Sequence, residues 1–222
     1  MTPNDLSPQE RETVNLFHRL YYETGRAGGT WQDTHWAGTR VLKCPLDLWI
    51  YQEIVWDVRP RLIIETGTFA GGSAMFLASL CDSLGGGEII SIDLDPQPDL
   101  PVHPRVRYLT GSSVDAEIVR QVQDAARQSG PVIVILDSDH SAAHVACELA
   151  LYSPFVSEGS YLIVEDTNVN GHPALPEFGP GPMEAVQDFL ARDHDFEVDG
   201  RREKFLMTFN PRGYLRRVAR SD

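Results

Sequence analysis

Acidic side chains follow two apolar runs of the sequence, and a histidine lies among them. Residues 137–140 read Asp-Ser-Asp-His after the run 132–136, and Glu165-Asp166 follow the run 161–164. If both runs are parallel strands, their carboxyl ends lie at one edge of a sheet, so these carboxylates should lie close together. Their repulsion would raise their pKa values, and a hard divalent cation would relieve it. Acids that merely cap the following helices would explain one acid per strand but not a cluster. We therefore predict a metal site formed by Asp137, Asp139, Glu165 and Asp166.

A histidine within this cluster suggests proton transfer. The pKa of an imidazole lies close to neutrality, which suits it to take a proton from a hydroxyl group. We predict His140 as a general base, with Lys43 as a second catalytic candidate from the N-terminal loop. His144 is either a further ligand, one helical turn later, or an ordinary helix residue.

A glycine-rich segment, residues 65–73, follows the first predicted strand. Its glycine spacing is not Gly-x-Gly-x-x-Gly, so the fingerprint of nicotinamide cofactors is absent. Glycines permit a tight turn and a close approach of a cofactor, although a generic strand-to-helix turn would look the same. The acid at the strand end would repel a pyrophosphate but could attract the ammonium group of a methionine moiety. The predicted cofactor-binding residues in this segment are Glu65, Thr66, Gly67, Gly71, Gly72 and Ser73.

Further cofactor candidates lie at the ends of the next strands. Asp93 closes the run 88–93, about where a ribose-binding acid belongs in a Rossmann-like domain. Ser112 and Ser113 follow the third strand and could meet an adenine edge, although Ser113 is equally suited to cap a helix. Asp137, after the fourth strand, completes the predicted cofactor-binding set.

Strands and helices alternate from about residue 46 onward, which predicts an α/β fold with a doubly wound, mostly parallel sheet. The run 132–136 is almost entirely β-branched, as is typical of a central strand buried on both faces. Late in the chain, Asp199-Gly200 is a hairpin signal between two runs, and this hairpin would place one antiparallel strand in the sheet. The predicted strands are 61–65, 88–93, 106–109, 132–136, 161–164, 196–198 and 204–209; the predicted helices are 47–57, 72–84, 183–191 and two that end near 128 and 156.

The N-terminal part differs from the rest of the chain. Residues 10–22 show helical spacing of apolar side chains, and a glycine-rich break at 25–29 precedes an aromatic loop with Trp31 and Trp36. We assign residues 1–49 to an N-terminal helix and loop and residues 50–222 to the main domain. The loop either packs on the edge of the domain or forms a lid over the site.

The composition narrows the classes of function. With 222 residues the chain is long enough for one α/β domain, and a formal net charge of −13 argues against nucleic acid as a partner. No apolar run approaches the length of a membrane span, and the N-terminus does not resemble a secretory signal. Three widely spaced cysteines favour reduced thiols, so we expect a cytoplasmic protein.

These segments together resemble the cephalosporin hydroxylase-like family, which includes S-adenosylmethionine-dependent O-methyltransferases of macrolide and rhamnosyl sugars. The resemblance covers most of the chain and is most specific at residues 136–140 and 164–167. It implies a Rossmann-like class I methyltransferase fold with a seven-stranded sheet and a C-terminal antiparallel hairpin, and it implies association into homo-oligomers. The other matching segments are 42–51, 65–73 and 204–211.

The resemblance also implies roles for individual residues. Asp137, Glu165 and Asp166 would ligate Mg²⁺, His140 would be the general base, and the glycine-rich segment with Asp93 would hold S-adenosylmethionine. The acceptor would be a hydroxyl group of a small molecule such as a glycoside. Asp139 remains an alternative ligand. Two other interpretations stay open: a hydroxylase with non-haem iron bound by His140, an acid and His144, or a non-catalytic module with the same fold.

Overall fold

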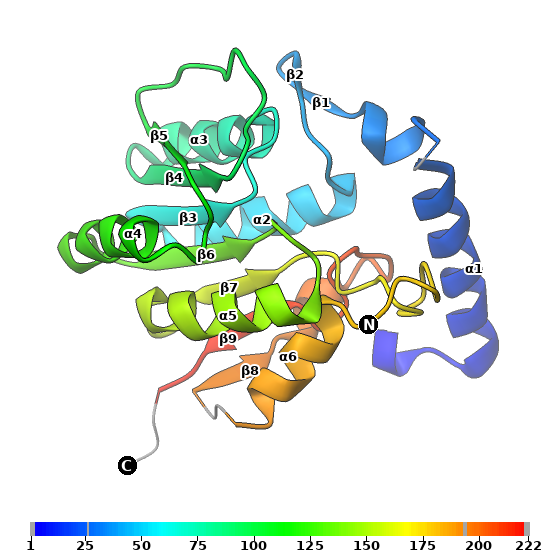
Figure 1. Ribbon diagram of the computed structural model, residues 1–222. Helices are drawn as coiled ribbons and strands as arrows, with labels where there is room; N and C mark the ends of the chain where they lie inside the picture. The colour runs from blue at the N-terminus through cyan, green and yellow to red at the C-terminus, as the bar shows by residue number, and fades with distance from the viewer. Residues whose placement is uncertain (1–2, 26, 193–194, 220–222) are drawn as a thin grey trace.

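The computed structural model describes residues 3–25, 27–192 and 195–219, and its centre is a seven-stranded sheet (Figure 1). Arg26 of the predicted glycine-rich break and the outer ends of the predicted segments 1–49 and 50–222 lie outside the described residues. The sheet order is β5-β4-β3-β6-β7-β9-β8, and β9 runs antiparallel to both of its neighbours. This confirms the mostly parallel sheet and its antiparallel strand. The strands are β3 (Leu62–Thr66), β4 (Glu88–Asp93), β5 (Val106–Thr110), β6 (Val132–Leu136), β7 (Tyr161–Val164), β8 (Phe196–Val198) and β9 (Tyr214–Arg217).

Helices cover both faces of the sheet, because the central strands are apolar on both sides. All five residues of β6 are buried, and alternate side chains of β6 belong to two separate core clusters. One cluster packs against α2 (Pro45–Val58) and α3 (Gly72–Leu84). The other packs against α4 (Ala116–Gln128), α5 (Ala142–Tyr152) and α6 (Pro182–Leu190), and a short 3-10 helix, η3 (Ser153–Phe155), follows α5.

The prediction of a strand at residues 204–209, the second strand of the hairpin, is wrong. Residues 204–209 form turns and bends, and the antiparallel strand is β9, later in the chain. Asp199 does not begin a two-residue turn, because its side chain accepts a hydrogen bond from the backbone of Arg201 and starts the 3-10 helix η4 (Gly200–Glu203). The apolar side chains of the segment are used elsewhere: Phe209 packs edge-on against Tyr22, with ring centroids 4.9 Å apart. The segment therefore joins the N-terminal helix to the domain instead of extending the sheet.

The N-terminal segment lies beside the carboxyl ends of the strands (Figure 1). The predicted helix 10–22 is confirmed within α1 (Pro8–Gly25). Trp31 stacks on Tyr22 at 5.2 Å between ring centroids and donates a hydrogen bond from Nε1 to the Tyr22 carbonyl oxygen. The remaining elements of this segment are η1 (Pro3–Asp5), η2 (Thr30–Asp33) and the two short paired strands β1 (His35–Trp36) and β2 (Thr39–Arg40).

The strand register brings the predicted site segments to one level. Thr66 of β3 pairs with Leu136 of β6, and Leu136 pairs with Val164 of β7. The chain therefore leaves each strand at Gly67, Asp137 and Glu165 respectively, side by side. Strand order also reverses between β3 and β6, which is where ligands bind in sheets of this kind. Within the described ranges, no helix combines the length and apolar character needed to cross a membrane.

Candidate active site

A cavity of about 690 Å³ opens at the carboxyl ends of the strands. Its volume is in the range typical of small-molecule sites. The strand ends and the loops after them form one side, and the N-terminal segment forms the other with Tyr22, Trp31 and Leu42. The remaining lining residues are Gly67, Phe69, Ile92, Asp93, Leu94, Ser112, Ser113, Asp137, Ser138, Asp139, His140, His144 and Asp166.

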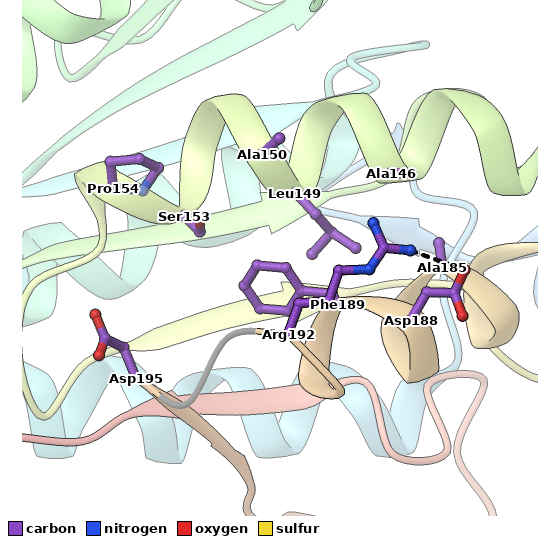
Figure 2. A pocket seen from close by; sticks show the side chains of 10 residues that line it. All are labelled: Ala146, Leu149, Ala150, Ser153, Pro154, Ala185, Asp188, Phe189, Arg192 and Asp195. Carbon is purple, nitrogen blue, oxygen red and sulfur yellow. Dashed lines mark hydrogen bonds and ion pairs between the residues drawn. The ribbon is translucent and has the colours of Figure 1, made fainter.

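A second cavity, of about 670 Å³, lies between α5 and α6 (Figure 2). Leu149 and Phe189 line it, and the charged pair Arg192 and Asp188 is a solvent-exposed contact of 3.4 Å between α6 and the turn that follows it. Several predicted site residues, among them Asp137, His140 and Asp166, line the first cavity and none lines the second, so the first is the candidate active site.

The centre of the site is a cluster of two carboxylates and an imidazole. One ligand atom each from Asp137, His140 and Asp166 lie within 4.8 Å of one another. His140 Nε2 lies 3.3 Å from Asp166 Oδ2. These are three of the residues that the sequence placed at neighbouring strand ends, and the structure brings them together.

Glu165 lies beside this cluster but faces a different partner. Its Oε1 atom accepts hydrogen bonds from Lys43 Nζ at 2.5 Å and from the Tyr51 hydroxyl at 2.7 Å. Lys43 is buried and also donates to Asp137 Oδ2 at 2.6 Å. The ammonium group thus bridges Asp137 and Glu165. Lys43 was predicted as a catalytic candidate, and the structure places it inside the acid cluster.

Burial and mutual repulsion set the pKa values of these groups. Burial raises the pKa of Asp137 and of Asp166, and burial together with the charge of Asp137 raises the pKa of Glu165 to about 7. Burial alone would lower the pKa of His140 and of Lys43, but the neighbouring carboxylates outweigh it and raise both. Three carboxylates therefore face one permanent cation, which leaves an excess of negative charge.

Asp139 and His144 lie apart from the cluster. Asp139 Oδ1 accepts a hydrogen bond from the backbone of Ser141 at 2.8 Å, and the side chain and backbone of Ser141 together lower the pKa of the carboxyl group. His144 Nε2 lies 3.0 Å from the Ser113 hydroxyl and 3.6 Å from the carboxylate of Glu148. Both Asp139 and His144 line the cavity without joining the cluster of possible metal ligands.

Close contacts between chain segments explain two glycines of the predicted cofactor loop. Gly67 has a φ of +89°, and a Cβ atom there would lie 1.9 Å from the carbonyl oxygen of Asp137. A Cβ atom at Gly72 would lie 2.1 Å from the carbonyl oxygen of Arg40, in the N-terminal segment. Gly67 lets β3 and β6 end side by side, and Gly72 lets the N-terminal segment pack against the start of α3.

The predicted cofactor-binding residues separate into two groups. Half of the set lines the cavity: Gly67, Asp93, Ser112, Ser113 and Asp137. The others lie behind its wall: Glu65, Thr66, Gly71, Gly72 and Ser73. Glu65 is fully buried; its Oε2 accepts from Ser91 at 2.8 Å, and its Oε1 has no hydrogen-bond partner among the described residues.

Asp93 organises the glycine-rich loop. Its Oδ2 accepts a hydrogen bond from the backbone of Phe69 at 2.7 Å, and its Oδ1 accepts one from Asp95 at 3.0 Å. Each carboxylate oxygen can accept a further hydrogen bond from a ligand in the cavity. The alternative that Ser113 caps a helix is wrong, because the side chain of Asp115 caps α4.

Sequence reasoning missed Tyr51 as a site residue. Tyr51 lies in α2, and a single aromatic residue in an apolar helix is typical of a core position. Its hydroxyl group nevertheless contacts the carboxylate of Glu165. Tyr22 and Phe69 were also missed, although both line the cavity. A buried tyrosine needs a partner for its hydroxyl group, and this requirement is the signal that could have pointed to a polar site near α2.

Comparison with known proteins finds a matching family model, a similar relative and two similar solved structures. The family model described as Rhamnosyl O-methyltransferase/CmcI matches residues 28–218. A rhamnosyl O-methyltransferase of Mycobacterium bovis (strain BCG / Pasteur 1173P2) is 39% identical over 208 residues, covering 90% of this chain and 82% of the relative. An apo structure of CmcI is 25% identical with a TM-score of 0.65, covering 85% of this chain and 78% of that chain. A second CmcI structure, with Mg and SAM, has a TM-score of 0.67 at 24% identity, covering 86% and 79%.

Proposed function

The chain belongs to the rhamnosyl O-methyltransferase/CmcI family, and from this premise we propose that it is an S-adenosylmethionine-dependent O-methyltransferase that uses a divalent cation. The observation that carries the proposal is the cluster of Asp137, His140 and Asp166 in the cavity of about 690 Å³ that Asp93 and Ser112 also line. One part of the cavity offers acids for a cation, and another offers hydrogen-bonding groups for a nucleoside.

The residues present fit a hard divalent cation. Carboxylate oxygens are the ligands that Mg²⁺ prefers, and buried acids with raised pKa values are stabilised in their charged form by a nearby cation. Asp137 and Asp166 would hold the ion, with Glu165 beside them as a third carboxylate. A non-haem iron site of two histidines and one carboxylate fits less well, because His144 contacts Ser113 and Glu148 instead of the cluster.

The cavity also fits S-adenosylmethionine. The Asp93 carboxylate lies at the end of β4, where a ribose would meet it, and Ser112 and Ser113 lie at the end of β5, near the expected place of an adenine. Gly67 brings backbone to the cavity surface between these groups and the acid cluster. The cofactor would therefore lie across the ends of β3, β4 and β5, with its methionine part toward Asp137.

The acceptor we propose is a hydroxyl group of a sugar, and specifically of a rhamnosyl residue, because the curated relatives are rhamnosyl O-methyltransferases. The wall of the cavity that faces the acid cluster contains the aromatic rings of Tyr22 and Trp31. Aromatic faces pack well against the apolar faces of sugar rings. A sugar with two neighbouring hydroxyl groups could present both to the cation site.

The side chains then have distinct tasks. When bound, S-adenosylmethionine supplies an activated methyl group, and a divalent cation makes a nearby hydroxyl group more acidic. His140 lies beside both acids on the cavity wall and takes the proton of the acceptor hydroxyl. Positive charge near Asp137 and Asp166 would offset their effect on the pKa of His140 and favour its neutral, proton-accepting form. The remaining rate enhancement comes from the orientation of the acceptor hydroxyl toward the methyl group, because the methyl group needs no further activation.

Calorimetric titration with S-adenosylmethionine tests the cofactor assignment. We expect binding in the micromolar range by the wild type and loss of that binding in Asp93→Ala. Asp95→Asn is the matched control, since Asp95 is an exposed acid two residues away and should bind like the wild type. No binding by the wild type, with or without Mg²⁺, would contradict the proposed function.

A further inference from the structure

Two buried side chains support the acid cluster from behind the cavity wall. Tyr51, on α2, and Asn210, in the loop that leads to β9, are 1% and 0% exposed. Neither lines the cavity, so neither can touch a substrate or a cofactor there. Both nevertheless contact the acids proposed to hold the cation.

The hydrogen bonds of these two residues form one chain with a fixed direction. The Tyr51 hydroxyl donates to Glu165 Oε1 at 2.7 Å and accepts from Asn210 Nδ2 at 3.1 Å. A phenol has a single proton, so a hydroxyl that donates to a carboxylate must accept from the amide. The other end of the amide, Asn210 Oδ1, accepts from the backbone nitrogen of Asp166 at 3.1 Å. The chain therefore runs from the backbone of Asp166 through Asn210 and Tyr51 to the carboxylate of Glu165.

Asp166 needs such support because of its backbone. Its φ of 53° lies in the left-handed region, which costs about 1–2 kcal/mol for a residue with a side chain. The hydrogen bond from its nitrogen to Asn210 helps to hold this conformation. In this conformation the Asp166 carboxylate faces His140, at 3.3 Å. Asn210 thus determines where one of the acids points.

The loop that carries Asn210 is itself fixed against β7. Gly213 donates to the Asn210 carbonyl oxygen at 2.9 Å, and the Asn210 nitrogen donates to Thr208 Oγ1 at 3.0 Å. The Thr167 hydroxyl donates to the Pro211 carbonyl oxygen at 2.7 Å. A Cβ atom at Gly213 would lie 2.2 Å from the carbonyl oxygen of Val164, so the loop lies directly against the strand end that precedes the acids.

We propose that Tyr51 and Asn210 are positioning residues for the divalent-cation site. Tyr51 fixes the carboxylate of Glu165, Asn210 fixes the backbone of Asp166, and the hydrogen bond between them couples the two acids. This inference rests on the proposed function, because it assumes that these acids bind a cation. It assigns part of the affinity for the cation to residues that cannot reach it.

The test compares two buried tyrosines whose hydroxyl groups have different partners. Tyr51→Phe removes the hydroxyl group that contacts Glu165, and Tyr214→Phe removes one that donates to Asp47 at 2.9 Å and lies 3.5 Å from the Thr208 hydroxyl. The two rings pack against each other, and both are buried. Calorimetric titration with Mg²⁺ alone should give an affinity about 10–100-fold weaker for Tyr51→Phe, as is usual when a group behind a metal ligand is removed. Tyr214→Phe should stay near the wild-type affinity.

Asn210→Leu is the second variant, and it removes both the acceptor for Asp166 and the donor to Tyr51 without adding a charge near the acids. It should also weaken Mg²⁺ binding, while the affinity of both variants for S-adenosylmethionine without metal stays at the wild-type value. Wild-type Mg²⁺ affinity in Tyr51→Phe, or an equal loss in Tyr214→Phe, would overturn the positioning role and leave the proposed function standing. A wild type that binds no divalent cation would overturn both.

Discussion

At the scale of single residues, the site is dominated by unbalanced negative charge. Lys43 supplies the permanent positive charge, shared between Asp137 and Glu165, and His140 contacts Asp166. The sequence predicted that Asp137, His140 and Asp166 meet, because the ends of neighbouring parallel strands must. It could not predict that Lys43 bridges two of the acids or that Asp139 faces Ser141, because side-chain orientation depends on packing around each residue.

The affinity for Mg²⁺ should depend on pH. Burial and Asp137 raise the pKa of Glu165 to about 7, so below that pH the metal-free site holds a proton. A cation must displace this proton, and binding therefore tightens as the pH rises toward 8 and weakens as it falls toward 6. The change should be up to about tenfold per pH unit for each displaced proton. Calorimetric titrations with Mg²⁺ across this pH range check it, and an affinity that stays constant would contradict the assignment.

His140→Ala should separate catalysis from cofactor binding. Loss of a general base typically lowers turnover by about 10²–10⁴-fold. The affinity for S-adenosylmethionine should remain, because His140 belongs to the acid cluster and not to the proposed nucleoside part of the cavity. Steady-state rates and cofactor titrations measure the two effects. His35→Ala, at an exposed histidine on β1, is the control; equal losses of turnover and cofactor affinity in His140→Ala would exclude the role of base.

At the scale of elements, apolar periodicity and the alternation of strands and helices predicted the sheet well. The failure came at residues 204–209, whose apolar character suggested a strand. In the structure Phe209 packs with Tyr22 and Trp31, and its nitrogen donates to the buried carboxylate of Asp47 at 2.8 Å. A partner that lies more than 150 residues away is not visible in local periodicity. Tyr22 and Trp31 of the N-terminal segment line one side of the cavity, and Phe209 packs against both rings.

Gly72→Ala tests how the N-terminal segment packs on the domain. Alanine is ordinarily favourable in a helix, but a Cβ atom at this position would lie 2.1 Å from the carbonyl oxygen of Arg40. We expect a loss of about 1–3 kcal/mol in the free energy of unfolding, as is typical of overpacking. Gly200→Ala is the control, since its Cβ atom would meet nothing within 4 Å. Urea unfolding measures both, and equal stability of the two variants would show that the contact does not form.

At the scale of the whole molecule, the parts of the proposed site meet at one edge of the sheet, where the parallel strands end. The ends of β4 and β5 carry the groups proposed to bind a nucleoside, the ends of β6 and β7 carry the acids, and the N-terminal segment adds aromatic side chains to the cavity. The sequence predicted that the residues after β4 and β5 and the acids after β6 and β7 lie at one edge, because strand order follows from the fold class. A lid formed by residues 1–49 stays a prediction, because a helix and an aromatic loop in the sequence fit both a lid and a fixed edge of the domain.

The most direct test is methyl transfer by metal-free enzyme. The protein is treated with a chelator, and transfer from methyl-labelled S-adenosylmethionine to a panel of rhamnosides is measured before and after Mg²⁺ is restored. We expect labelled methyl ether only with the divalent cation, and no rescue by Mg²⁺ in Asp137→Asn. Transfer that continues at the same rate without metal, or no transfer to any rhamnoside with Mg²⁺ present, would contradict the proposed reaction.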